Sequence, residues 1–105
     1  TVHVSEPVKN YIVTVVNATR DHGAFSYGCS PRASLALMRA GQSVAAMDGR
    51  SYLLPRDVRD LAVPVLSHRL PLKMQARSEW ESSAQALGDI LDRHPVEKWE
   101  TPEDS

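Results

Sequence analysis

The sequence has little that would tie it to a membrane, a disulfide framework or nucleic acid. Its single cysteine, Cys29, has no second cysteine to pair with inside the chain. No apolar run is long enough to cross a bilayer, and the amino end lacks a signal-peptide pattern. The 12 Lys and Arg residues are balanced by 13 Asp and Glu residues, so that the net charge is only −1. We therefore expect a soluble cytoplasmic domain with no membrane insertion and no nucleic-acid partner.

Catalytic motifs are also missing. The chain has no glycine-rich phosphate loop, no Walker A or Walker B motif, and no Ser, His and Asp set that local sequence would bring together. The histidines stand singly, without the spacing of a metal site, at His3, His22, His68 and His94. At 105 residues the chain is one small domain, too short for a nucleotide-binding sheet with its helices. We expect a module or fragment of a longer protein, inactive as a catalyst and without metal or cofactor when isolated.

What is present is a helical pattern. Apolar residues recur at intervals of three and four in four segments, which predicts an all-α fold, a small four-helix bundle. The first, second and fourth helices are predicted at about 6–21, 31–48 and 83–93, and the third begins at Pro55. Pro64 interrupts the third pattern and predicts a kink or a split there. Residues 1–94 are interpreted as one domain, and 95–105 as a mobile acidic tail with Trp99 as a candidate anchor.

The second helix has the clearest boundaries. Ser30 can cap its start, Pro31 suits its first turn, and Gly49 ends it. Its apolar residues, which include Leu35 and Met47, cover most of the circumference. This predicts the middle of the bundle, with neighbours on several sides. The interior glycine at position 41 predicts a close helix crossing.

Two segments outside the helices are predicted to be extended. The first is the connector 49–54, which leads to the third helix. The second, residues 68–74, alternates apolar and polar side chains. A short two-strand pairing between 68–74 and the connector around Tyr52 would fit this alternation. Phe25 and Tyr27 are expected to tuck the preceding loop against the helices.

Arg32 is the candidate functional residue. It falls in the first turn of the second helix, where a cation faces the positive end of the helix dipole at a cost of about 0.3–1 kcal/mol. A guanidinium that points out of the domain at a phosphate would explain this placement, whereas the alternative is a solvated arginine. Arg39 and Arg50 lie with Arg32 on one narrow strip of polar or small residues along the second helix, and they could extend such a surface. This strip consists of Arg32, Ala36, Arg39, Ser43 and Arg50. Arg20 and Arg69 end their segments, which favours dipole or salt-bridge roles.

Four ordered blocks of the sequence resemble the carboxy-terminal lid domain of MoxR-type AAA+ ATPases. The resemblance covers roughly residues 4–94, and Tyr11-Ile12-Val13 and Thr19-Arg20 are similar to the first lid helix. The four blocks are Gly28-Cys29-Ser30-Pro31-Arg32-Ala33-Ser34-Leu35-Ala36-Leu37, Gly49-Arg50-Ser51-Tyr52, Pro55-Arg56-Asp57-Val58 and Val65-Leu66-Ser67-His68-Arg69-Leu70.

The resemblance implies a role for Arg32 in a longer parent ATPase. Arg32 would be the sensor-2 arginine, which contacts the γ-phosphate of ATP bound at the core domain of the same subunit or of a neighbour. ATP and Mg would be held by that core, in a ring that is typically hexameric. Hydrolysis would let the lid rotate and would drive chaperone-like remodelling of client proteins or assembly of metal cofactors.

Two residues depart from the family pattern. Leu54 stands where relatives carry a Thr, Ser or Asp cap, so the third helix is expected to begin without side-chain capping and to fray. Cys29 stands where a small alanine is common. Neither departure touches Arg32.

Two other functions are open to such a chain. One is a helical DNA-binding or histone-like module, because a long central helix followed by residues 50–58 resembles the end of a histone fold. Its weakness is the lack of an excess of basic residues. The other is a free-standing protein-interaction bundle that docks through the exposed strip of the second helix.

Overall fold

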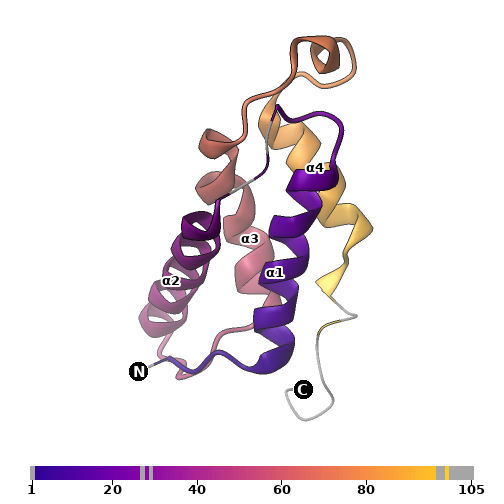
Figure 1. Cartoon of the computed structure of the whole chain (residues 1–105). Coiled ribbons are helices and arrows are strands. Elements are labelled where there is room, and N and C mark those ends of the chain that lie inside the picture. Colours follow the sequence, from indigo (N-terminus) through magenta and orange to yellow (C-terminus); the bar gives the residue numbers. More distant parts are fainter. Residues whose placement is uncertain (1, 27, 29, 97–98, 100–105) are drawn as a thin grey trace.

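The structure is a computed structural model that describes residues 2–26, 28, 30–96 and 99. It confirms the predicted all-α bundle (Figure 1). Two short 3-10 turns, η1 and η2, precede the last helix. The elements are α1 (Glu6–Asp21), α2 (Pro31–Met47), α3 (Pro55–Leu66), η1 (Ser67–Arg69), η2 (Met74–Ser78) and α4 (Ser83–Arg93). None of the helices in the described ranges is both long and apolar enough to span a membrane.

The core lies between the four helices. One face of α1 is buried along its whole length, through Val8, Tyr11, Ile12, Val15, Val16 and Thr19, as its periodicity predicts. Each such apolar side chain contributes about 1.5–3 kcal/mol when it is fully removed from water. Val58, Ala62 and Leu66 of α3, and Leu87 and Ile90 of α4, meet this face.

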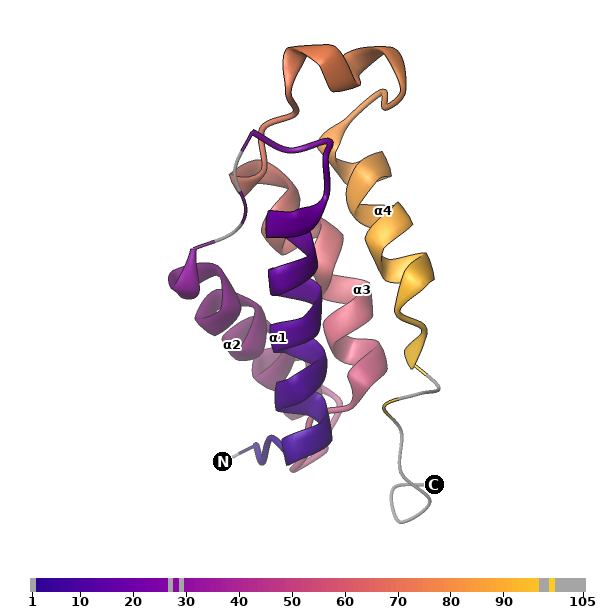
Figure 2. The same ribbon diagram turned by 45° about the vertical axis from the view of Figure 1, so that its right-hand side comes forward.

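The helix α2 lies at one side of the bundle, and α4 lies at the other (Figures 1 and 2). The prediction that this helix is the middle of the bundle is therefore wrong. It buries a single stripe of Ala33, Leu37, Gly41 and Ala45 against its neighbours α3 and α1. Leu35 and Met47 are 41% and 88% exposed. The apolar arc of α2 is wider than the described part of the chain can cover.

Gly41 marks a close approach, but the element that approaches is not a helix. A Cβ atom at this position would lie 2.7 Å from Cδ1 of Leu53 in the connector before α3. Leu53 is itself 3% exposed, so that its side chain fills the notch that the glycine leaves. The connector is thereby held against the face of α2.

The prediction that 68–74 pairs with the connector around Tyr52 is wrong. Two isolated backbone bridges occur in the described residues, and they join other partners: His3 with Tyr52, and Phe25 with Leu72. The first bridge has bonds from His3 N–H to the carbonyl of Ser51 (2.7 Å) and from Leu53 N–H to that of His3 (2.9 Å). The predicted extended segment is also shorter than expected, because 68–69 belong to η1 and Met74 begins η2. Alternation in the sequence therefore fits only residues 70–73, and the helix packing chose their partner.

The end of α2 and the start of α3 form one linked turn. Gly49 has φ +77°, and its N–H donates to the carbonyl of Ala46 while the N–H of Arg50 donates to that of Ala45. This is the Schellman arrangement that a glycine after the C-cap favours. It turns Arg50 toward α3.

As expected, Leu54 provides no side-chain cap at the start of α3, but Asp57 holds this start instead of leaving it frayed. Leucine has no side-chain acceptor, so Leu54 cannot cap the helix itself. The carboxylate of Asp57 instead accepts the backbone N–H of Leu54 at 2.9 Å, which supplies one half of a capping box. The same carboxylate also accepts hydrogen bonds from the two terminal nitrogens of the Arg50 guanidinium, at 2.7 and 3.0 Å.

Pro64 does not split α3. The helix runs through it to Leu66 and then tightens into η1. The missing N–H of Pro64 removes one helical hydrogen bond, to the carbonyl of Asp60, and only two residues of α3 follow it. The proline therefore stands close to the natural end of the helix.

The last helix and the segment after it close the far side of the core. Ser82 caps α4 by accepting the N–H of Gln85 at 3.1 Å, and the helix ends at Arg93 as predicted. Val96 is buried, and the Trp99 ring packs at 5.6 Å from that of Tyr11, as expected of an anchor. The rest of the predicted mobile tail, 97–98 and 100–105, lies outside the described residues, as do Tyr27 and Cys29.

Candidate functional site

Arg32 lies at the exposed start of α2. Its side chain is exposed, and it makes no hydrogen bond or ion pair with any other residue that the structure describes. The first turn of α2 contains no acidic residue that could neutralise it. The guanidinium is thus a cation with unused donors at the positive end of a helix.

The backbone at this helix start is also open. Ser30 stands at the N-cap with extended backbone angles (φ −76°, ψ 165°), and Pro31 follows as predicted. However, the Ser30 hydroxyl makes no capping hydrogen bond, contrary to the expectation from its position. The first-turn N–H groups beside Arg32 therefore lack a side-chain cap.

Gly28 fixes the path by which the chain enters α2. A Cβ atom here would lie 2.7 Å from the Cα of Arg20 and would collide with the Arg20 side chain as well. Because a backbone atom cannot move aside like the end of a side chain, any larger residue would push the helix start away from α1. Phe25, upstream in the same loop, is buried as expected.

Arg39 and Arg50, the two arginines expected to extend this surface, differ in their surroundings. Arg39 is exposed two turns after Arg32 on the same side of α2. Arg50 does not extend this surface, because it is bound by Asp57 and by Asp48 at 3.1 Å. Its hydrogen bonds to Asp57 raise the pKa of the guanidinium above its usual value, against the opposing effect of burial.

An apolar groove runs beside the start of α2, between this helix and α1. Ile12 and Val13 line it from α1, and Leu35 and Met38 line it from α2, in a volume of about 340 Å³. Val13 is 51% exposed although Ile12 beside it is buried. Sequence reasoning missed this groove because it assigned the wide apolar arc of α2 to buried contacts.

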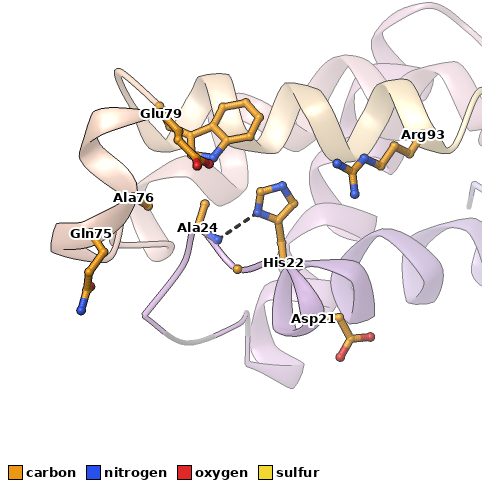
Figure 3. A pocket seen from close by; sticks show the side chains of 9 residues that line it. Asp21, His22, Ala24, Gln75, Ala76, Glu79 and Arg93 are labelled. Atoms are coloured by element: carbon orange, nitrogen blue, oxygen red, sulfur yellow. Dashed lines mark hydrogen bonds between the residues drawn. The ribbon is translucent and has the colours of Figure 1, made fainter.

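A second feature that the sequence did not reveal surrounds His22, at the end of α1. Its Nδ1 accepts the backbone N–H of Ala24 at 3.2 Å (Figure 3). Its Nε2 atom lies 3.0 Å from a carboxylate oxygen of Asp89 on α4. The ring lies 5.5 Å from those of both Phe25 and Trp80. Within the described ranges, no three His, Cys, Asp or Glu side chains converge as metal ligands.

Comparison with known proteins shows the family. The AAA lid domain family matches residues 17–90. The chain is 37% identical over 90 residues to the uncharacterized protein YeaC of Bacillus subtilis, with 86% of this chain and 28% of that protein covered. It is 36% identical over 97 residues to the chaperone MoxR1 of Mycobacterium tuberculosis, with 84% and 26% covered.

A solved structure has the same fold. The crystal structure of a "putative ATPase" from Cytophaga hutchinsonii superimposes with a TM-score of 0.82 at 32% identity and covers 90% of this chain and 32% of that one. The chain thus spans between a quarter and a third of the length of these relatives. The matched residues include all of α2 and α3, with the exposed Arg32 at the start of α2. This chain belongs to the AAA lid domain family, as a lid domain of the MoxR-type AAA+ ATPases.

Proposed function

We propose that this lid domain supplies Arg32 as the sensor-2 arginine of a cytoplasmic AAA+ ATPase. The guanidinium would contact the γ-phosphate of ATP held with Mg by the core domain of the same subunit or of a neighbour in a hexameric ring. The parent would couple hydrolysis to chaperone-like remodelling of client proteins or to assembly of a metal cofactor. The observation that carries the proposal is the exposed guanidinium, unpaired among the described residues, at the start of α2.

The physical argument is one of charge. A guanidinium offers paired donors that match two phosphate oxygens, and such charge-assisted hydrogen bonds are roughly twice as strong as neutral ones. The guanidinium of Arg32 and the positive end of the α2 dipole repel each other in the free domain. Once a phosphate binds, this arrangement becomes favourable, because the guanidinium and the helix end both attract the anion. Loss of the γ-phosphate would release the lid, which would convert hydrolysis into movement.

The first test compares ATP with ADP. In the full-length parent, Arg32→Ala should weaken binding of a non-hydrolysable ATP analogue by about 10- to 150-fold, because roughly 1.5–3 kcal/mol of charged hydrogen bonding is lost. Binding of ADP should be unchanged, since it has no γ-phosphate. Isothermal titration calorimetry measures the affinities of the parent and the variant for the ATP analogue and for ADP. An equal loss of affinity for both nucleotides would contradict a γ-phosphate contact.

We propose that the ATPase core domain covers the apolar groove between α1 and α2 when the lid closes. The groove adjoins the helix start that carries Arg32, and Val13 and Leu35 would leave water when the lid closes on the core. A cover of this kind explains why a helix with so wide an apolar arc lies at the side of the bundle.

A charge placed in this groove should disrupt the closure. We expect Leu35→Asp to lower ATP turnover of the full-length parent several-fold without unfolding the lid, because Leu35 is already 41% exposed. The matched control is Ser43→Asp, which places the same charge at an exposed position of α2 outside the groove. Turnover is measured with ring size and melting temperature, and equal rates for the two variants would exclude the groove as a contact.

A further inference from the structure

The loop after α1 is tied to the segment that precedes α4. The N–H of Ser26 donates to the carbonyl of Pro71 at 2.9 Å, and the N–H of Lys73 donates to that of Ala24 at 2.8 Å. Phe25, between these two ties, is buried in the core. Residues 24–26, which connect α1 to α2, are therefore held by the segment that precedes α4.

His22 adds a side-chain tie from the same loop to α4. Because its Nδ1 accepts the N–H of Ala24, the hydrogen of the neutral ring lies on Nε2 and is donated to Asp89. The ring packs between Phe25 and Trp80, and only 9% of the side chain is exposed. In Figure 3 the ring points from the end of α1 toward α4, beside an open hollow of about 420 Å³.

Charged groups at or beside this ring come from α4, from α1 and from the segment just after η2. Asp89 also accepts from Arg93, at 3.0 Å on the same helix α4. Asp21 belongs to α1, and Glu79 lies just after η2. Asp89 is thus the carboxylate that joins the loop to α4, and its side chain is 26% exposed.

We propose that His22 and Asp89 are positioning residues for Arg32, an inference that rests on the proposed sensor function. Only residues 27–31 separate Ser26 from Arg32, and Gly28 within them lies against the backbone of Arg20. Ser26, whose N–H is held by the carbonyl of Pro71, thus lies only six positions before Arg32. Releasing the His22 ring would loosen the hold on residues 24–26 and let the start of α2, with the guanidinium of Arg32, shift away from its phosphate. A displacement of about 1 Å at such a group can lower a rate by up to roughly 10²-fold.

The test compares two aspartates on one helix in the full-length parent. Asp89→Ala removes the acceptor of His22, whereas Asp92→Ala removes an equal charge that lies 3.9 Å from Arg59 and is 78% exposed. We expect Asp89→Ala to accelerate amide hydrogen exchange across residues 23–34 and to lower ATP turnover about three- to tenfold. Asp92→Ala should change neither quantity.

Two further variants separate positioning from simple destabilisation. His22→Asn keeps an acceptor for the N–H of Ala24 but cannot reach Asp89, so its turnover should fall like that of Asp89→Ala. Asp89→Asn keeps an acceptor for His22 and should restore most of the rate. If His22 and Asp89 act through Arg32, adding Asp89→Ala to Arg32→Ala should cause no further loss of turnover.

The outcomes distinguish the two proposals. Normal turnover of Arg32→Ala would reject the sensor assignment, whatever the exchange data show. A slow Arg32→Ala parent together with unchanged exchange at 23–34 in Asp89→Ala would overturn the positioning role alone. The positioning role would also be rejected if the turnover losses of Arg32→Ala and Asp89→Ala multiply in the double variant.

Discussion

Arg32→Ala is expected to slow ATP hydrolysis by the full-length parent roughly 10²-fold, the loss typical of removing one preorganised donor from a developing negative charge. This corresponds to about 2.7 kcal/mol of lost transition-state stabilisation. The fold should be unaffected, because Arg32 is exposed and holds no other described residue. Steady-state turnover under saturating ATP, together with a melting curve, measures both expectations.

The matched control for this experiment is Arg39→Ala. Arg39 is an exposed arginine of the same helix, so its loss changes the charge of the domain equally. Turnover close to that of the unmodified parent is expected for Arg39→Ala. If both variants lose activity to the same degree, a general electrostatic effect of α2 would replace the sensor assignment.

Mixed rings can tell which subunit receives the guanidinium. Subunits with Arg32→Ala would be mixed with subunits that carry Arg32 but whose core cannot hydrolyse ATP. If Arg32 reaches the neighbouring nucleotide, mixed rings regain part of the activity, because an intact core then meets an intact arginine. If Arg32 serves its own subunit, the mixture stays as slow as either component.

Asp57→Ala is expected to lower the free energy of unfolding of this chain by about 2–4 kcal/mol. The carboxylate accepts two bonds from Arg50 and one from the backbone of Leu54, and its side chain is 9% exposed. Its removal leaves a largely buried guanidinium, 18% exposed, without its main partner and opens the start of α3. Urea unfolding followed by circular dichroism measures the shift in midpoint.

Asp60→Ala is the control for this stability prediction. Asp60 lies one turn later on α3, is exposed, and pairs with no residue that the structure describes. Its replacement should change the free energy of unfolding by no more than about 0.5 kcal/mol. A loss as small as this in Asp57→Ala would show that the Arg50–Asp57 pair does not hold the junction between α2 and α3.

The helix boundaries could be predicted because their signals are local. Pro31 and Pro55 begin α2 and α3, and Gly49 adopts the positive φ that ends α2. Such residues act through their own backbone preferences, which the surrounding fold does not need to supply. The periodicity of α1 likewise identified its buried face, because its apolar residues form a single stripe along one side of the helix.

The roles of Asp57 and His22 could not be predicted in the same way. Leu54 indicated an uncapped helix, yet Asp57 closes that end while it binds Arg50 seven positions earlier. The partner of His22 is Asp89, 67 positions away along the chain. Neither a lone histidine nor an ordinary first-turn aspartate carries a local signal for such partners.

The sequence by itself determined the four helices, their ends and the exposed position of Arg32, since helix starts and stops depend on neighbouring residues. Only the tertiary structure decided that α2 lies at the side of the bundle with Leu35 uncovered, and that His3 rather than 68–74 pairs with Tyr52. Apolar periodicity shows which side of a helix is apolar, but not how many other elements pack against that side. That number depends on how all the elements fill space together, and packing of this kind has no local code.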